Sequence, residues 1–477
     1  MLAWSVIKLA TLALLPSAVI GGFVHQQIHK EQYQQYLRDV PALASVTSSS
    51  AAQWIEQVRL ERAVLFTNLA VRSGYALAKQ TNGLIVALEH RYYGDSNPFS
   101  DYATQNLRFL ASEQAVEDAA TFARNFTTSN NLPSCTKWIP VGGSYPGNLA
   151  AWFREIHPEI FWAAHSSSAP LTAKIDFWEY SYAVHQGIPK IAGGSQVCAD
   201  NLARLTTLFD KAIVNDPEGT RLYLGLGTME LDGDVGSFLP STALAGSIQY
   251  GPVGQQFNAT VTQIDAACSG KYFPSFADPK ATDSQLWSDL QAYVLATLAN
   301  YGITPNNDTQ LLTLETLSLQ DPSNSGRLWY WQTCNEFGYF QDAEHIRQPI
   351  YSRTINVDYY TQACDILFEG YDWPDTQDTN ALYKATDIKT DRIVFVNGAI
   401  DPWHWLGIFN RTSTPAQPTF FHDQFHCGDL FVPLQTDSPL LIQIKGQIMA
   451  TWINILSGDT CPSQVKTCGG IRIVEDS

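Results

Sequence analysis

An apolar run, a glycine-rich turn and an amphipathic helical pattern follow one another without interruption over residues 138–157. In "KWIPVGGSYPGNLAAWFREIHP" the apolar run covers 138–141, and Ser144 stands in the turn. Pro146 falls in the first turn of the predicted helix, where a missing N–H costs little. The apolar residues of that helix recur at i, i+3, i+4 and i+7 and so share one face: Leu149, Trp152, Phe153 and Ile156. The pattern predicts a buried strand, a tight turn and a helix.

Similar apolar runs occur at 84–88, in "FWAAHSSSAP" (161–170) and in "RIVFVNGAIDPW" (392–403). Helical patterns separate them, and this alternation predicts an α/β fold built on a parallel sheet. The segment "WIEQVRLERAVLFTNLAVRSGYALAKQ" (54–80) has helical spacing of its apolar residues and predicts another helix. Strand patterns are sparse in the middle of the chain, where "QLWSDLQAYVLATLANYG" (285–302) is typical.

These patterns predict an organisation in four parts. Residues 1–22 read as a signal peptide, because their apolar stretch ends in small residues and is shorter than the roughly 20 residues that span a bilayer. Residues 23–60 form a polar segment and linker. The α/β domain comprises 61–171 and 371–477, and a mostly helical insertion, 172–370, lies between its two parts.

Composition and cysteine usage limit the binding partners and the cellular compartment that we expect. The chain has 29 basic and 46 acidic residues, and a net charge of −17 disfavours binding to nucleic acid. Eight cysteines with no C-x-x-C pair suggest disulfides in an exported chain. Four N-x-S/T sequons are candidate glycosylation sites: Asn125, Asn258, Asn307 and Asn410. We therefore expect secretion, with delivery to a vacuole or lysosome as the alternative, and no membrane association after signal cleavage.

Ser144 is a candidate nucleophile. A serine on a strand–turn–helix unit is raised on a nucleophile elbow, and glycines nearby relieve the crowding of its backbone. The following helix offers N–H groups to a developing oxyanion, and the N–H of Tyr145 is the first candidate donor. Gly142 and Ser144 match the start of G-x-S-x-G, but Pro146 occupies the last position and Gly147 follows it. The alternative is a loop serine without a chemical role.

A serine nucleophile needs a base, and the base needs an acid that orients it. Asp401 follows a predicted strand, and His426 lies later in "FHDQFHCGDL", which gives the order Ser, Asp, His found on this kind of elbow. Rival residues stand close to both in the sequence: His404 and His422 as bases, and Asp423 and Asp429 as acids.

Six motifs occur in order: "EHRYYGDSNP" (89–98), "GGSYPG" (142–147), "SSAP" (167–170), "WYWQTCNEFGYF" (329–340), "NGAIDPW" (397–403) and "HCGDL" (426–430). Together they resemble the serine peptidase family of prolyl carboxypeptidase, dipeptidyl peptidase II and the fungal prolyl endopeptidases. The resemblance extends from about residue 64 to the C-terminus.

The resemblance implies an α/β-hydrolase fold with a helical cap, proline-containing peptides as substrates and cleavage after proline, without a metal or cofactor. It assigns Ser144 as nucleophile, His426 as general base and Asp401 as the acid that orients it. Trp403 corresponds to an aromatic wall of the proline pocket, and ordinary core packing is its alternative role. Within the motifs we expect Glu89 to pair with Arg91. In the cap, Cys334 and Cys364 are plausible disulfide partners.

The chain departs from the resemblance near its N-terminus. The family begins its mature domain with several strands and a Gly-Gly-Glu-Gly-like loop that supplies an oxyanion donor, and nothing similar precedes residue 64. We expect either a divergent member or an N-terminal part that is missing from the sequence. Two further readings stay open: an esterase on the same fold, and an inactive secreted relative.

Overall fold

The computed structural model describes residues 62–66, 78, 83–191, 193–225, 268, 273–300, 324–343, 347, 350–368, 373–431 and 437–457. The predicted signal peptide, the polar segment 23–60 and the sequons at Asn258 and Asn307 lie outside these residues. In the described part of the chain, no helix combines the length and the apolar character needed to cross a membrane.

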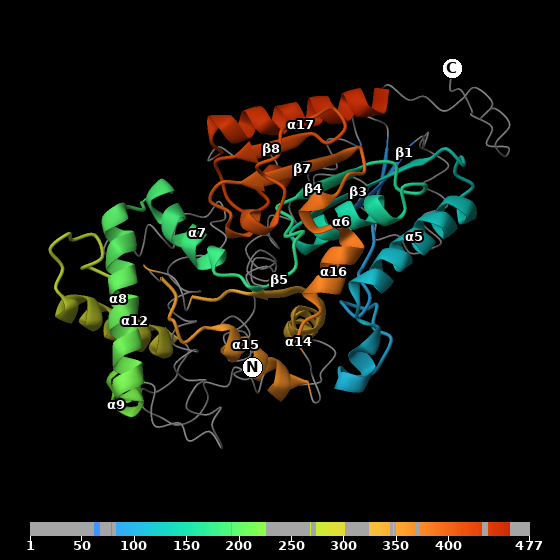
Figure 1. The fold of residues 1–477 in the computed structure, drawn as a ribbon. Coiled ribbons are helices and arrows are strands. Elements are labelled where there is room, and N and C mark those ends of the chain that lie inside the picture. The colour runs from blue at the N-terminus through green and yellow to red at the C-terminus, as the bar shows by residue number, and fades with distance from the viewer. Residues whose placement is uncertain are drawn as a thin grey trace.

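A parallel sheet of six strands, in the order β2-β1-β3-β4-β7-β8, forms the centre of the molecule (Figure 1). The strands are β1 (Arg62–Phe66), β2 (Leu84–Ala87), β3 (Lys137–Gly143), β4 (Ala164–Ser167), β7 (Ile393–Gly398) and β8 (Thr419–His422). All of their carboxyl ends therefore lie at one edge. The strands predicted from the apolar runs are confirmed, and the two halves of the sheet join where β4 pairs with β7.

The prediction of a helix over 54–80 is wrong for residues 62–66, which form β1. This strand pairs with β2 on one side and β3 on the other, with Ala63 opposite both Leu84 and Trp138. Backbone hydrogen bonds to two neighbouring strands outweigh a local helical spacing, because tertiary context routinely overrides helix propensity.

The alternation of side chains along β7 explains how the sheet is covered. Val394 and Val396 pack with the apolar face of α17 (Pro439–Ser457), while Ile393 and Phe395 belong to the core on the other face. In Figure 1, α17 lies along one side of the sheet, and α6 (Tyr145–Ile156) and α5 (Ser112–Ser129) lie along the other. Both faces are thus buried, as a parallel sheet requires.

Helices from the middle of the chain gather below and to the left of the sheet in Figure 1. They are α7 (Glu179–Gly187), α8 (Gln196–Asn215), α9 (Pro217–Tyr223), α12 (Asp283–Asn300), α14 (Ser325–Gln332) and α15 (Val357–Leu367), and α12 confirms the helix predicted from 285–302. A two-stranded parallel sheet, β5 (Lys174–Asp176) with β6 (Gly338–Phe340), lies among them. Disulfides Cys334–Cys364, as expected, and Cys198–Cys268 cross-link this region.

Shorter elements complete the described chain. One helix, α16 (Thr376–Tyr383), packs beside α6, and a π-helical turn, η3 (Thr333–Phe337), continues α14. The 3₁₀ turns are η1 (Thr104–Phe109), η2 (Ile188–Lys190), η4 (Ala385–Asp387), η5 (Pro402–Leu406) and η6 (Gly428–Leu430). The last two stand at the carboxyl ends of β7 and β8, which places them at the same edge as the turn after β3.

Candidate active site

Ser144 stands between β3 and α6 in a strained backbone conformation. Its φ is 62° and its ψ is −136°, a region that residues with a side chain rarely occupy. The conformation is held from both sides: the Ser144 N–H donates to the Ser167 carbonyl over 2.9 Å, and the Ser144 carbonyl accepts from the Gly147 N–H over 2.7 Å. This is the geometry of the predicted nucleophile elbow.

Two glycines make the turn possible. A Cβ on Gly142 would lie 1.9 Å from the Pro146 carbonyl oxygen, and one on Gly147 would lie 2.7 Å from the Ser167 carbonyl oxygen. Both obstacles are backbone atoms that no side-chain rotation could remove. The displaced last glycine of the motif therefore has a structural reason: position 147, rather than 146, is where α6 approaches β4.

Asp401 and His426 form a buried pair. The Asp401 carboxylate Oδ1 lies 2.8 Å from His426 Nδ1, and it also accepts the Trp403 backbone N–H over 2.9 Å. Asp401 is wholly buried, and it follows β7 as His426 follows β8. Because both strands are parallel and adjacent, their carboxyl ends bring the acid and the base together.

The rival acids and bases have other partners. Asp429 accepts from Ser167 Oγ over 2.6 Å and lies 2.9 Å from His165 Nε2. Asp423 accepts a hydrogen bond from Ser438, His404 contacts the Asp401 carbonyl rather than its carboxylate, and His422 Nε2 is 4.0 Å from Asp429. Among these candidates, Asp401 and His426 are the pair that the structure joins.

The loop that carries His426 packs directly against the elbow. Cys427 Sγ lies 2.7 Å from where a Cβ on Gly143 would be, and the Cys427 N–H donates to Ser168 Oγ over 2.8 Å. His426 Nε2 is buried and has no hydrogen-bond partner in the described part of the chain. In enzymes without substrate, the hydrogen bond between nucleophile and base is often long and tightens only on binding.

The surroundings of His426 change its basicity. Burial by itself lowers the pKa of an imidazole, but the Asp401 carboxylate and the neighbouring Cys427 side chain outweigh it and raise the pKa of His426 to about 10. The carboxylate thus favours the imidazolium that forms when a base takes a proton.

Tyr145 is the first residue of α6, where backbone N–H groups have no partner within the helix. Its side chain is held firmly. The hydroxyl lies 3.1 Å from His90 Nε2 and 3.0 Å from Gln332 Nε2, and the ring centroid lies 5.5 Å from that of Phe337. The residue after the candidate nucleophile is therefore fixed by both the sheet domain and α14.

Trp403 is buried in an aromatic cluster. Its ring centroid lies 5.4 Å from those of Phe177 and Tyr180 and 5.5 Å from that of Tyr339. The centroid of His426 is 6.5 Å away, so the indole adjoins the candidate base. Core packing accounts for most of this environment, and a role in substrate binding stays a prediction.

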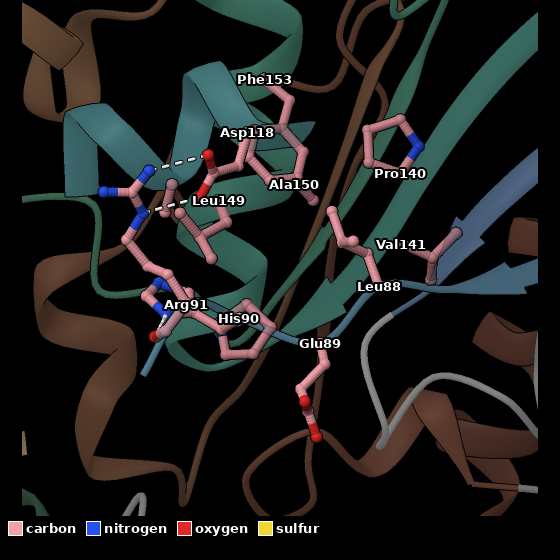
Figure 2. Close-up of a pocket in the computed structure, with 12 residues that line it drawn as sticks. Leu88, Glu89, His90, Arg91, Asp118, Pro140, Val141, Leu149, Ala150 and Phe153 are labelled. Atoms are coloured by element: carbon pink, nitrogen blue, oxygen red, sulfur yellow. Dashed lines mark hydrogen bonds and ion pairs between the residues drawn. The ribbon is translucent and has the colours of Figure 1, made fainter. Parts of the chain in front are cut away.

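Figure 2 shows a small cavity lined by residues of α6, of β3, of α5 and of the segment after β2. Its volume is about 40 Å³, enough for a few water molecules but not for a peptide. Neither Ser144, Asp401 nor His426 lines it, so this cavity is not the candidate active site.

The same view corrects the expected pairing of Glu89 with Arg91. Arg91 instead forms a two-pronged ion pair with Asp118 of α5, over 2.6 and 2.7 Å (Figure 2). Glu89 accepts the backbone N–H groups of Asp95 and Ser96 over 3.0 and 2.8 Å. Residues two positions apart share a face only in an extended segment, and here the chain turns at Arg91 and at Tyr92, whose φ is 70°, so the two side chains do not meet.

Sequence reasoning missed Gln332 and His90 as residues of the site. Both stand inside the motifs "WYWQTCNEFGYF" and "EHRYYGDSNP", which was the available signal, but no spacing rule links them to Tyr145. The anchoring of Asp429 by His165 and Ser167 was also missed. Of the sequons that the structure describes, Asn125 on α5 and Asn410 after η5 are both exposed.

Comparison with known proteins identifies the family of this chain. Residues 64–448 match the family described as Serine carboxypeptidase S28. The chain belongs to this family. It is 31% identical to the serine protease vicPb of Bipolaris victoriae over 72% of this chain and 69% of that one. It is 30% identical to the thymus-specific serine protease of Mus musculus over 77% of this chain and 73% of that one.

Membership of the S28 family makes the protein a serine-type peptidase with peptides as its substrates. Its fold is the α/β-hydrolase fold with a helical cap: a parallel sheet covered on both faces, with helices from the middle of the chain gathered to one side. A further relative, named "Probable extracellular serine carboxypeptidase", comes from Arthroderma benhamiae and is 32% identical over 70% of this chain and 50% of its own.

Proposed function

We propose that Ser144, His426 and Asp401 form the catalytic triad of this S28 peptidase, and that it cleaves peptides after proline. The observation that carries the proposal is the buried Asp401–His426 pair, whose loop is packed against the Ser144 elbow through Cys427. A nucleophile, a base and an orienting acid are the components that acyl transfer needs.

The reaction follows from these positions. His426 Nε2 takes the proton from Ser144 Oγ as the oxygen attacks the carbonyl carbon of the scissile bond, and the resulting oxyanion accepts the Tyr145 N–H. The imidazolium then gives its proton to the leaving amine, and the C–N bond breaks. Water, deprotonated by the same imidazole, hydrolyses the acyl-enzyme and restores the Ser144 hydroxyl.

Proline specificity is the finer part of the proposal. The indole of Trp403 adjoins His426, and a flat aromatic face is a good partner for a compact apolar ring. We expect peptides with proline on the acyl side to be cleaved faster than matched alanine peptides. Equal rates would contradict proline specificity, and a preference for simple esters over both peptides would favour the esterase alternative.

A fluorophosphonate probe tests the nucleophile, because only an activated serine reacts with it. The wild-type chain should label, and Ser144→Ala should not, with both showing the same melting temperature. Ser166→Ala is a matched control, since Ser166 is a buried serine on β4 and has no place in the proposed mechanism. Labelling that survives Ser144→Ala would assign the nucleophile elsewhere.

Export is proposed on separate grounds. Two disulfides join described cysteines, and exposed sequons at Asn125 and Asn410 are open to modification. Expression in a eukaryotic host should deliver the protein to the medium or to the vacuole. The recovered protein should begin near residue 23 and lose mass on glycosidase treatment. Retention of the full N-terminus on an unglycosylated cytosolic chain would contradict export.

A further inference from the structure

A chain of hydrogen bonds runs from the helical cap to the residue that follows the nucleophile. Tyr93 Oη lies 2.7 Å from Gln332 Oε1, Gln332 Nε2 lies 3.0 Å from Tyr145 Oη, and Tyr145 Oη lies 3.1 Å from His90 Nε2. His90 Nδ1 lies 2.8 Å from the Arg91 carbonyl oxygen, where the chain ends. Gln332 is wholly buried at the end of α14.

The last of these contacts fixes the direction of all the others. A carbonyl oxygen can only accept, so His90 Nδ1 must carry a hydrogen. Burial lowers the pKa of His90 to about 4, and the neutral ring then has an acceptor at Nε2. Tyr145 must donate to that nitrogen, so Gln332 must donate to the Tyr145 oxygen.

Every member of the chain is therefore satisfied in one arrangement. The Gln332 carbonyl oxygen is left to accept from Tyr93, as its position requires. A reversed Gln332 amide would turn its carbonyl oxygen toward Tyr145, whose single hydrogen cannot be donated both to that oxygen and to His90 Nε2. Fully satisfied buried networks hold their members in a single geometry.

We propose that Gln332 and His90 are positioning residues that orient Tyr145 and, through it, the backbone N–H that stabilises the oxyanion. This rests on the proposed serine mechanism. Tyr145 follows a strained residue, and its hydroxyl is held by two partners, Gln332 of the cap and His90 of the segment after β2. The cap thereby contributes to the catalytic power of the site as well as covering it.

Three variants each remove a member of this hydrogen-bond chain: Tyr145→Phe, Gln332→Leu and His90→Leu. Each should lower kcat and the fluorophosphonate labelling rate by roughly 10-fold, less than the 10²–10³-fold loss of a whole oxyanion donor. KM should change little. Affinity for a peptide boronic acid, which forms a tetrahedral adduct on the serine, should fall in parallel with kcat.

Tyr102→Phe is the matched control. It removes a buried tyrosine hydroxyl that donates to the Tyr92 carbonyl over 2.8 Å and accepts from Asn97 Nδ2 over 2.9 Å. It should lower the melting temperature as Tyr145→Phe does, yet keep the wild-type labelling rate. The double variant Tyr145→Phe with Gln332→Leu should be no slower than Tyr145→Phe alone, because both act through one hydrogen bond.

Several outcomes would overturn the inference. If Tyr145→Phe and Gln332→Leu label at the wild-type rate, or slow only as much as Tyr102→Phe, the chain of hydrogen bonds has a purely structural role. A wild-type protein that labels but cleaves no proline peptide contradicts the proposed substrate, and the labelling series still decides the positioning role. A wild-type protein that never labels contradicts the serine mechanism and this inference together.

Discussion

At the scale of single residues, the proposed catalytic pair of Asp401 and His426 should govern how activity depends on pH. The base must be neutral to accept a proton, and its pKa is raised above the ordinary value of 6.5. Activity should therefore appear only as pH rises above neutrality. An enzyme that worked best in an acidic compartment would need this balance to change when substrate binds.

Replacing Asp401 tests that balance. In Asp401→Asn the raising influence of the carboxylate is lost while burial, which lowers the pKa of His426, remains. The acidic limb of the labelling rate should move to lower pH in the variant, where only Cys427 still opposes the effect of burial, and the maximal rate should fall by roughly 10⁴-fold. An acidic limb at the same pH in the wild type and in Asp401→Asn would contradict the pairing of Asp401 with His426.

The same pair should contribute to stability with a definite sign. A folded pKa above the unfolded value of 6.5 means that the folded state holds this proton more tightly. The contribution is complete below pH 6.5 and is lost as pH rises toward 10. The neutral form of His426, which the proposed mechanism needs, therefore gives a less stable fold than the protonated form.

At the scale of secondary-structure elements, the loop between β8 and η6 must fit tightly over the end of β3. A Cβ on Gly143 would lie 2.7 Å from both Cys427 Sγ and Leu430 Cδ1. These obstacles are side-chain atoms, so Gly143→Ala should fold while pushing the His426 loop outward. A displacement of about 1 Å can cost roughly 10²-fold in rate.

A second substitution can make room for the first. In the double variant Gly143→Ala with Cys427→Ala, the sulfur is gone and the nearest remaining atom of residue 427 is its Cβ, at 3.4 Å. Part of the labelling rate lost in Gly143→Ala should return, although Leu430 still crowds the site. Cys427→Ala alone serves as the control. A double variant as slow as Gly143→Ala would show that the loop does not respond to this contact.

The strand–turn–helix unit at Ser144 was predictable because its signal is local: an apolar run, glycines and helical spacing lie within a few turns of chain. β1 was not, since Arg62–Phe66 becomes a strand only through partners at 84–87 and 137–141. The contact of Tyr145 with Gln332 joins residues 187 positions apart in the sequence, and a local periodic pattern cannot predict a contact over such a separation.

At the scale of the whole molecule, Glu336 joins the cap to the sheet domain. Its carboxylate, on η3, accepts the Ser112 N–H over 3.0 Å at the start of α5 and also contacts the Ser112 hydroxyl. Its carboxylate interacts electrostatically with the carboxylate of Glu113 and with four tyrosine hydroxyls, those of Tyr93, Tyr145, Tyr339 and Tyr383. Burial outweighs the hydrogen bonds and raises the pKa of Glu336 to about 7.

Glu336 should stabilise the folded state more in mild acid than at neutral pH. An acid whose folded pKa lies above its unfolded value favours folding when protonated, so its contribution should fall as pH rises from 4.5 to 7, while His90, with its lowered pKa, contributes with the opposite sign. The full Glu336 contribution corresponds to roughly 3 kcal/mol. The free energy of unfolding of the wild type minus that of Glu336→Gln should therefore decrease over this interval, and the same difference for Glu218→Gln, on the exposed start of α9, should stay constant. A difference for Glu336→Gln that grows with pH would contradict the sign.

The two halves of the sheet meet along β4 and β7, and the proposed nucleophile lies in one half while its proposed acid and base lie in the other. During synthesis, the first half leaves the ribosome long before residue 426 exists. On the proposed mechanism, a nascent chain that ends before this residue carries Ser144 with no base to activate it. The order of the strands along the chain would then delay activity until translation is nearly finished.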